Sequence, residues 1–249
     1  MSGKGGVGKS SVAALLAVVL AREGHRVGIL DADLTGPSIP KLFGVTDRVG
    51  EGDFGAYLPK SRVLGIYVLS ANLLLQREDD PVIWRGPVIS NVVKQFWSGV
   101  AWGKLDYLIV DLPPGTGDVP LTVMQSLPLH GVLIVSSPQD LTVMIVRKAI
   151  KMAGMMNVPI IGLIENMTYT TCPKCGDKIF VFGEPRGQQV AEENGIQLLA
   201  SLPLDPELSK LGDAGRIEEY VSPSLENLSQ TLDRRVKSSF KTTRMLFGK

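Results

Sequence analysis

Short apolar runs alternate with helical patterns along this chain. Runs rich in β-branched residues predict six strands, at residues 26–31, 63–70, 105–111, 131–136, 159–165 and 197–202. Some of these runs, such as YLIVD and GVLIV, are continuously apolar, which is typical of parallel strands covered on both faces. Helical spacing predicts helices at residues 9–23, 88–99, 141–155, 187–194 and 224–240. This alternation predicts an α/β fold with a doubly wound, mostly parallel sheet.

The last predicted helix carries a single apolar stripe. Its apolar side chains recur every three or four positions, at Leu225, Leu228, Leu232 and Val236, which places them on one face. We expect this face to dock the helix on the rest of the protein. Because no low-complexity linker and no solenoid repeat breaks the pattern, we expect residues 1–249 to form a single domain.

Composition describes an ordinary folded protein. Of the 249 residues, 44% are hydrophobic and 6% aromatic, and the net charge is +1 with both signs interspersed. No global field therefore points to nucleic acid or to an anionic membrane. The longest apolar run, residues 12–21, is shorter than the roughly 20 residues that span a bilayer and has no features of a signal peptide. We expect a cytoplasmic protein.

A glycine-rich stretch leads directly into the first predicted helix. Residues 3–10, GKGGVGKS, match the pattern G-x-x-x-x-G-K-[ST] at every position. In this pattern glycine N–H groups and the helix N-terminus hold phosphate oxygens. Lys9 would reach the β- and γ-phosphates, and Ser10 would offer its hydroxyl to Mg²⁺. The sequence therefore predicts a phosphate loop that binds ATP with Mg²⁺.

The position of this loop at the start of the sequence is unusual. A phosphate loop normally follows a strand, yet only Met1 and Ser2 precede Gly3. We expect that upstream residues are absent from this sequence or that the start codon is misassigned. A chain beginning here would otherwise leave a gap in the central sheet.

Acidic residues follow two of the predicted strands. Asp31 and Asp33 lie in LDADLTGPS, and Asp111 lies in YLIVDLPPGTGD, which also contains Gly115. The carboxyl ends of parallel strands are where α/β folds place ligands. Phosphoryl transfer needs one carboxylate that positions water and others that hold the hydrated metal. A turn-capping role for Asp31 is an equally simple interpretation.

Both cysteines lie in one loop, residues 167–183, which interrupts the α/β pattern as residues 45–59 also do. Cys172 and Cys175 form a Cys-x-x-Cys unit followed by Gly176, so two thiolates can face one metal. A zinc knuckle remnant, a cluster ligand pair, a redox pair and inert thiols all fit this unit. The redox interpretation is weaker, because the unit lies in a polar loop before the short predicted strand KIFVF rather than at a helix start. Two chains related by a twofold axis would supply four thiolates.

Several motifs together resemble one known family. Lys4 gives the pattern K-G-G-x-G-K-[ST], which resembles the deviant Walker A loop of the MinD/ParA-like ATPases. The ordered set comprises SGKGGVGKS, DADLTGPSIP, VIWRGP, DLPPGTGD, SSPQDLTV, GLIENMTY and CPKCG. This set resembles the Mrp/ApbC iron-sulfur cluster carrier P-loop ATPases over nearly the whole chain. The resemblance implies a homodimer that binds ATP, bridges a 4Fe-4S cluster through Cys172 and Cys175, and passes it to apoproteins.

The resemblance also implies roles for individual residues. Lys4 would reach the partner's nucleotide, and Asp33 would position water and contact Mg²⁺. Asp31 would neighbour the magnesium or phosphate site, while Asp111 would hold Mg²⁺ through water. The nucleotide contacts implied in this way are Gly3, Lys4, Gly5, Gly6, Val7, Gly8, Lys9, Ser10, Ser11, Asp31, Asp111, Gly115 for the γ-phosphate and Asn166 for the adenine edge.

Two other functions also fit the sequence. A MinD/ParA-like positioning ATPase would bind a membrane or DNA, and the tail RRVKSSFKTTRMLFGK has basic and apolar residues, but that function leaves the cysteines unexplained. A zinc-bridged dimer is the other, because four thiolates suit zinc as well as a cluster. We expect neither nucleic acid nor stable membrane association. We expect slow hydrolysis, because no strong general base is evident.

Overall fold

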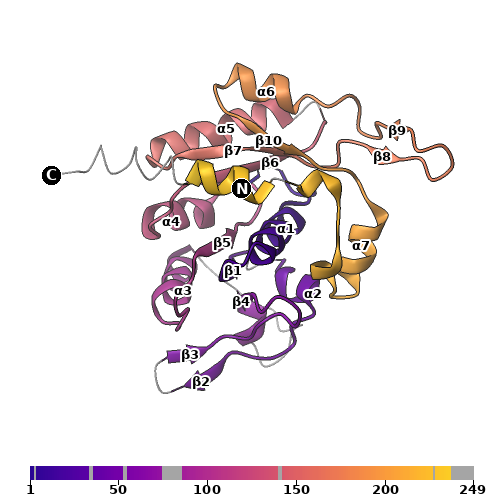
Figure 1. Cartoon of the computed structure of the whole chain (residues 1–249). Coiled ribbons are helices and arrows are strands. Elements are labelled where there is room, and N and C mark those ends of the chain that lie inside the picture. Colours follow the sequence, from indigo (N-terminus) through magenta and orange to yellow (C-terminus); the bar gives the residue numbers. More distant parts are fainter. Residues whose placement is uncertain are drawn as a thin grey trace.

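Two parallel three-stranded sheets form the centre of the molecule (Figure 1). The computed structural model describes residues 1–2, 4–33, 36–52, 55–74, 86–139, 142–226 and 228–236. One sheet has the order β4-β1-β5 and the other β10-β7-β6. Their strands are β1 (Val27–Asp31), β4 (Tyr67–Ser70), β5 (Tyr107–Asp111), β6 (Val132–Ser136), β7 (Ile160–Glu165) and β10 (Leu198–Ser201). All six predicted strands are confirmed, and all pairs between them are parallel.

Among the described residues, the helices include every predicted one and three more. The predicted helices are α1 (Lys9–Arg22), α3 (Gly86–Ser98), α5 (Thr142–Met155), α6 (Gly187–Glu193) and a C-terminal helix at residues 228–236. The sequence pattern missed α2 (Ile39–Phe43), α4 (Asp118–Ser126) and α7 (Pro206–Asp213). These three are short and each has a proline near its start. They contain too few turns for apolar residues to repeat at helical spacing. Short 3₁₀ turns occupy Ala71–Leu74, Ile217–Glu219 and Pro223–Leu225.

Both interrupting segments contain small antiparallel hairpins. The first pairs β2 (Gly50–Gly52) with β3 (Gly55–Tyr57), and the second pairs β8 (Thr170–Thr171) with β9 (Lys178–Ile179). The predicted strand KIFVF is therefore wrong beyond its first two residues. The chain turns there instead, and the Gly183 N–H donates to the Phe180 carbonyl.

The first two residues lie between the two sheets. The Met1 amino group donates to the Leu133 carbonyl at 2.6 Å, and the Met1 carbonyl accepts from the Val135 N–H. On the other side the Ser2 carbonyl accepts from the Gly115 N–H at 2.9 Å. Within the described residues no strand lies between β5 and β6 to join the two sheets. Met1 and Ser2 thus lead the phosphate loop to the carboxyl ends of both sheets.

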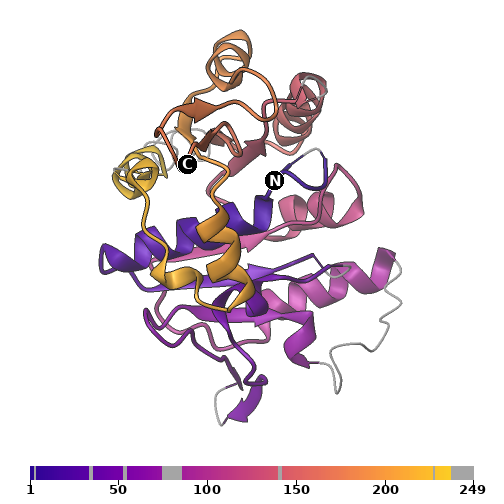
Figure 2. The same ribbon diagram turned by 90° about the vertical axis from the view of Figure 1, so that its right-hand side faces the viewer.

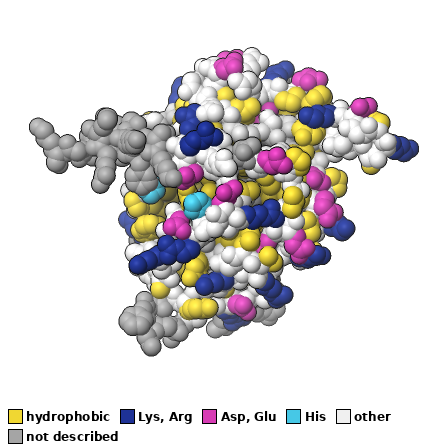
Figure 3. All heavy atoms as spheres, viewed as in Figure 1, with side chains coloured by type: hydrophobic (Ala, Val, Ile, Leu, Met, Phe, Trp, Pro, Cys, Tyr) yellow, Lys and Arg dark blue, Asp and Glu magenta, His cyan; other side chains and the backbone are white. Residues whose placement is uncertain are grey.

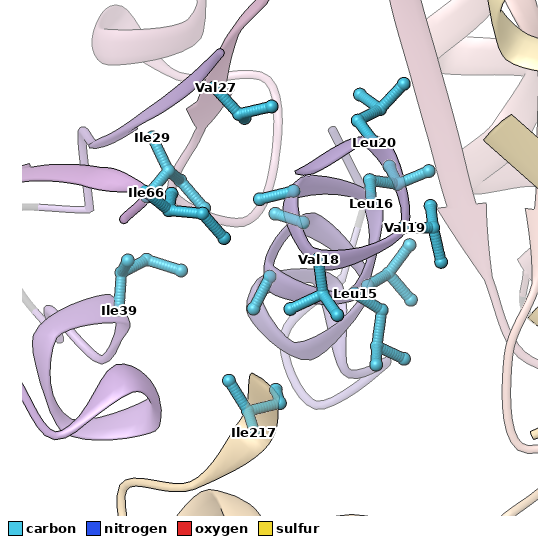
Figure 4. Packing of buried hydrophobic residues seen from close by; sticks show 14 of the residues in the cluster. Leu15, Leu16, Val18, Val19, Leu20, Val27, Ile29, Ile39, Ile66 and Ile217 are labelled. Atoms are coloured by element: carbon cyan, nitrogen blue, oxygen red, sulfur yellow. The ribbon is translucent and has the colours of Figure 1, made fainter. Parts of the chain in front are cut away.

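Helix α1 lies at the centre of the core. Figure 2 shows it between the half that contains α5 and α6 and the half that contains β1 and β4. Every residue from Val12 to Leu20 is buried. Figure 4 shows Ile29 and Ile66 on one side of this helix, while Leu16 and Val19 point to the opposite side. A helix that is apolar all round must be covered all round. The phosphate loop therefore continues into a firmly held element.

The C-terminal helix docks as its stripe predicts. Leu228 and Leu232 on this helix are buried in the same core as α1, and Val236 packs against it. Leu225 is buried there too, but it lies in the 3₁₀ turn before the helix, which therefore begins later than predicted. The Tyr107 hydroxyl of β5 also donates a hydrogen bond to Asp233 on this helix. The rest of the basic tail, residues 237–249, lies outside the described residues, as do Trp84 and Arg85 of the WRGP motif.

Candidate nucleotide and thiol sites

The phosphate loop connects Ser2 to the first turn of α1. Gly6 and Gly8 have φ values of +81° and +72°, a region that favours glycine. Gly8 is the N-cap of α1 and supplies no side-chain hydrogen bond to the first turn. The N–H groups at the start of α1 consequently remain available to an anion, which the helix dipole also favours.

A cavity of about 230 Å³ lies over this loop. Pockets that enclose a whole drug-sized ligand are typically about 300–1,000 Å³, so this cavity matches the phosphate part of a nucleotide better than the whole molecule. Its lining consists of Ser2, Lys4, Gly5, Gly6, Val7, Gly8, Lys9, Ser10, Ser11, Asp33 and Pro114. The structure thus brings together seven residues of the predicted loop, the predicted contact Ser11 and Asp33. Gly3 lies outside the described residues.

The loop lysine forms a buried ion pair. Lys9 Nζ lies 2.6 Å from Asp111 Oδ1, and the two side chains are only 9% and 1% exposed. Lys9 Nζ also lies 3.5 Å from the Ser10 hydroxyl. Among the described residues Asp111 Oδ2 is buried without a hydrogen-bond partner. Such an orphaned oxygen fits a water molecule or a hydrated cation beside the loop.

Asp31 lies next to this pair in the strand register. Asp31 on β1 is the direct neighbour of Asp111 on β5. Burial and the nearby Asp111 carboxylate raise the pKa of Asp31 to about 7, against the opposing effect of backbone N–H groups that donate to it. Ser38 and Ile39 supply two of these N–H groups, at 3.0 and 3.1 Å. The turn-capping interpretation of Asp31 is therefore supported, alongside its place beside the site.

Asp33 reaches the cavity because the chain turns after β1. Its N–H donates to Asp31 Oδ1 at 3.1 Å, and its own carboxylate accepts from the Gly36 N–H. Asp33 lines the cavity, whereas Asp31 is fully buried behind it. This separation favours Asp33 over Asp31 as the carboxylate that meets a ligand.

Three further predicted residues surround the loop. Lys4 Nζ donates to Gln139 Oε1 at 3.2 Å at the protein surface. Gly115 has a φ of +92° and donates its N–H to Ser2. The Asn166 side chain is buried behind the loop, where its amide donates to the Val7 carbonyl at 3.0 Å. Asn166 therefore contacts the phosphate loop directly.

Sequence reasoning missed two of these neighbours. Pro114 lines the cavity, and Gln139 accepts the hydrogen bond from Lys4. Both lie in motifs that mark the family resemblance, DLPPGTGD and SSPQDLTV. Their position next to the loop depends on how β5 and β6 are placed, which no local pattern indicates.

The two cysteines are carried by a hairpin that projects from the body of the protein. Figures 1 and 3 show the β8-β9 hairpin extending away from the rest of the surface. At its tip the Gly176 N–H donates to the Cys172 carbonyl, and the Cys172 N–H donates to the Asp177 carbonyl. Gly176 has a φ of +79°, so a glycine is favoured after the second cysteine.

Both thiols are accessible for binding. Cys172 is partly buried and Cys175 exposed, and neither forms a disulfide. Backbone N–H groups of Cys175 and Lys174 stabilise the Cys172 thiolate and lower the pKa of Cys172, with help from the Cys175 thiol. The thiolate is the form that binds metals. Within the described residues no three His, Cys, Asp or Glu side chains gather into a complete metal site.

The fold and the phosphate loop define a P-loop NTPase of the MinD/ParA type. The sequence matches the NUBPL iron-transfer P-loop NTPase family over residues 1–237, and the chain belongs to this family. An iron-sulfur cluster carrier protein of Clostridium perfringens is 46% identical over 229 residues, which cover 89% of this chain and 80% of the relative. Another from Saccharolobus solfataricus is 42% identical over 241 residues, covering 95% and 81%.

Solved structures agree with this assignment. A nucleotide-binding protein in complex with ADP from Archaeoglobus fulgidus has a TM-score of 0.82 and 47% identity, covering 91% of this chain and 88% of that one. The cell division ATPase MinD of Pyrococcus furiosus has a TM-score of 0.66 at 20% identity, covering 98% and 97%, and shows the fold alone. Among the described residues, no helix is both long and apolar enough to span a membrane.

Proposed function

We propose that this chain is an ATP-binding and slowly hydrolysing carrier of iron-sulfur clusters. Two copies would hold one 4Fe-4S cluster between them and deliver it to apoproteins. The observation that carries this proposal is a pair of free thiols, one exposed and one partly buried, on a projecting hairpin in a protein that also has a phosphate-loop cavity. We further propose a single domain over residues 1–249 that works in the cytoplasm, where reducing conditions keep both thiols free.

The homodimer follows from the number of ligands. A 4Fe-4S cluster is held by four cysteine thiolates, and this chain has two cysteines. A twofold axis near the hairpin tips would bring Cys172 and Cys175 of two copies together. The projection of the hairpin supports this arrangement, because Cys175 is exposed and Cys172 is only partly buried.

The nucleotide would lie with its phosphates in the cavity. The glycine N–H groups, Lys9 and the start of α1 would hold the phosphates, with Ser10, Asp33 and Asp111 arranged around Mg²⁺. Gly115 and Lys4 would have to leave their present hydrogen bonds with Ser2 and Gln139 to reach the γ-phosphate and a partner's nucleotide. Bound Mg²⁺ would neutralise charge that develops on the phosphates.

Slow hydrolysis follows from the side chains at hand. Among the described residues that line the cavity, Asp33 is the one carboxylate. A single carboxylate can orient water but is a weak base at neutral pH. Asp33→Ala should therefore lower the rate of ATP hydrolysis more than the affinity for ATP, because Lys9 and the loop N–H groups that hold the phosphates remain. A variant with wild-type turnover would remove Asp33 from this role.

Anaerobic reconstitution tests the cluster. Wild-type protein should take up about four irons per dimer, with the brown absorption of an iron-sulfur cluster. Cys172→Ser and Cys175→Ser should each lose the cluster while keeping ATP affinity, because the thiols lie on the hairpin rather than in the cavity. The Val221→Ser variant, at an exposed apolar residue, serves as a matched surface control that should keep the cluster.

The same experiment separates a cluster carrier from a zinc-bridged dimer. Four thiolates also suit zinc, so metal content should be measured in protein purified with and without oxygen. Iron that transfers to an apo-ferredoxin would support the carrier function. A dimer that binds only zinc, whatever iron and sulfide are supplied, would refute it.

A further inference from the structure

Asn166 is built into the back of the phosphate loop. Its side-chain Nδ2 donates to the Val7 carbonyl at 3.0 Å, and its own N–H donates to the Ser136 carbonyl at 2.8 Å. Asn166 as a whole residue is only 5% exposed. Asn166 is therefore fixed by β6 on one side and holds the loop on the other.

The loop is shaped to admit this side chain. A Cβ added at Gly8 would lie 2.4 Å from Asn166 Nδ2 and 3.2 Å from the Met167 side chain. Met167 itself has a φ of +59°, an uncommon conformation for a residue with a side chain. Gly8 thus permits a close approach as well as a left-handed backbone, and the contact with Asn166 depends on both.

The geometry points to a positioning function for Asn166: it orients the phosphate loop, in addition to the contact with the adenine edge that the family resemblance implies. In a planar trans peptide the carbonyl and the following N–H point in opposite directions. Because Asn166 holds the Val7 carbonyl on the buried side, the Gly8 N–H is directed toward the cavity that Val7 and Gly8 both line. That N–H is one of the groups expected to hold phosphate.

The Asn166 side chain can orient the loop that binds the phosphates and also contact the base. A carboxamide has two N–H donors and one carbonyl acceptor. Asn166 uses one N–H on Val7, which leaves the second N–H and the carbonyl for the edge of a base. This part of the inference rests on the proposed function, whereas the hold on the loop does not.

A ligand that has phosphates but no base distinguishes orientation of the loop by Asn166 from contact of Asn166 with the base. Calorimetry would measure binding of magnesium tripolyphosphate and of magnesium ATP to wild type and to Asn166→Ala. If Asn166 orients the loop, the variant should bind tripolyphosphate about 3- to 10-fold more weakly, the effect of one lost hydrogen bond, and ATP more weakly still. If only ATP binding falls and tripolyphosphate binding is unchanged, the positioning function is wrong.

Thr168→Val provides a matched control. The Thr168 hydroxyl is buried two residues further on and donates to the Leu202 carbonyl at 2.9 Å, so the change also removes one buried hydrogen bond. It should lower stability but leave tripolyphosphate affinity unchanged; an equal loss of affinity would mean general loosening and would overturn the inference. Asn166→Asp, which keeps the volume but not the donor, replaces Asn166→Ala if that variant does not fold.

The outcome does not depend on the cysteines. Neither ligand contains iron or contacts the hairpin, so failure of the cluster proposal would leave this result standing. If wild type binds neither tripolyphosphate nor ATP, the nucleotide site is refuted, and the positioning function with it.

Discussion

Lys9 Nζ lies 2.6 Å from Asp111 Oδ1 in the interior of the protein. The lysine expected to hold the β- and γ-phosphates is therefore neutralised by the carboxylate at the end of β5. Incoming phosphate must compete with that carboxylate for the lysine. Once the lysine has turned to the phosphate, the Asp111 carboxylate lacks a counter-charge, which Mg²⁺ can supply. This exchange of partners joins two motifs that are about a hundred residues apart in the chain.

Removal of Lys9 should destabilise the nucleotide-free protein. Lys9→Ala leaves Asp111 buried beside Asp31 without a counter-charge, and breaking a buried pair in this way typically costs about 3–5 kcal/mol. Urea unfolding without nucleotide would measure the free energy of unfolding. The double variant Lys9→Ala/Asp111→Asn should recover part of the loss, because it removes the uncompensated charge. Equal stability of the single and double variants would show that the ion pair contributes little.

The same substitution should abolish tight ATP binding. Lys9 is the one lysine that lines the cavity from within α1, and its loss removes a charge-assisted contact to the phosphates. Titration with a fluorescent ATP analogue would measure the change against Lys4→Ala. Because Lys4 is exposed and bound to Gln139, Lys4→Ala should have the smaller effect on a monomer. Unchanged ATP affinity in Lys9→Ala would contradict the phosphate-loop assignment.

Local patterns predicted the loop but not its surroundings. The octet of residues 3–10 is enough to identify the phosphate site, because its glycines, its lysine and its serine each have a defined contact with the phosphates or Mg²⁺. The strand ends that supply Asp31 and Asp111 were also predicted, since their runs are apolar. The pairing of Lys9 with Asp111 and the hold of Asn166 on Val7 were not. Both depend on which strands become neighbours, and this is decided by packing over the whole chain.

The stability of the protein should depend on the ionisation of Asp31. The raised pKa of Asp31, about 7 against an ordinary 3.8, means that the folded protein binds a proton that the unfolded chain releases between those two values. The contribution of Asp31 to stability is then fully present below about pH 4, falls as the pH rises toward 7, and stays low above it.

Urea unfolding of wild type and Asp31→Asn between pH 4.5 and 8 would test this dependence. Asparagine does not titrate, so the difference between the two proteins isolates Asp31 from other groups. The stability of wild type relative to the variant should fall with rising pH, by at most about 1.4 kcal/mol per pH unit. A constant difference across this range would show that Asp31 is ionised throughout, as its three backbone donors favour.

Cys172 should react with iodoacetamide at lower pH in the folded protein than in the unfolded chain. The N–H groups of Cys175 and Lys174 lower the pKa of Cys172, and only the thiolate is alkylated. Cys175→Ser keeps these N–H groups and leaves one thiol to follow by mass spectrometry. The same variant in urea is the control, because unfolding removes the donors. Identical pH profiles with and without urea would contradict the predicted shift.

Glu165 should hold the base of the cysteine hairpin. It ends β7 directly before Asn166, is buried, and accepts a hydrogen bond from the Arg186 N–H at 3.0 Å, so it closes the segment that carries both thiols. Glu165→Ala removes this closure, and amide hydrogen exchange at residues 186–187 should become about tenfold faster. Gln188→Ala, which alters only an exposed contact with Glu192 on α6, should leave exchange there unchanged. Equal protection in both variants would show that other contacts hold the base of the hairpin. Faster exchange in Glu165→Ala alone would show that the hairpin is anchored at the end of β7, next to the residue that holds the phosphate loop.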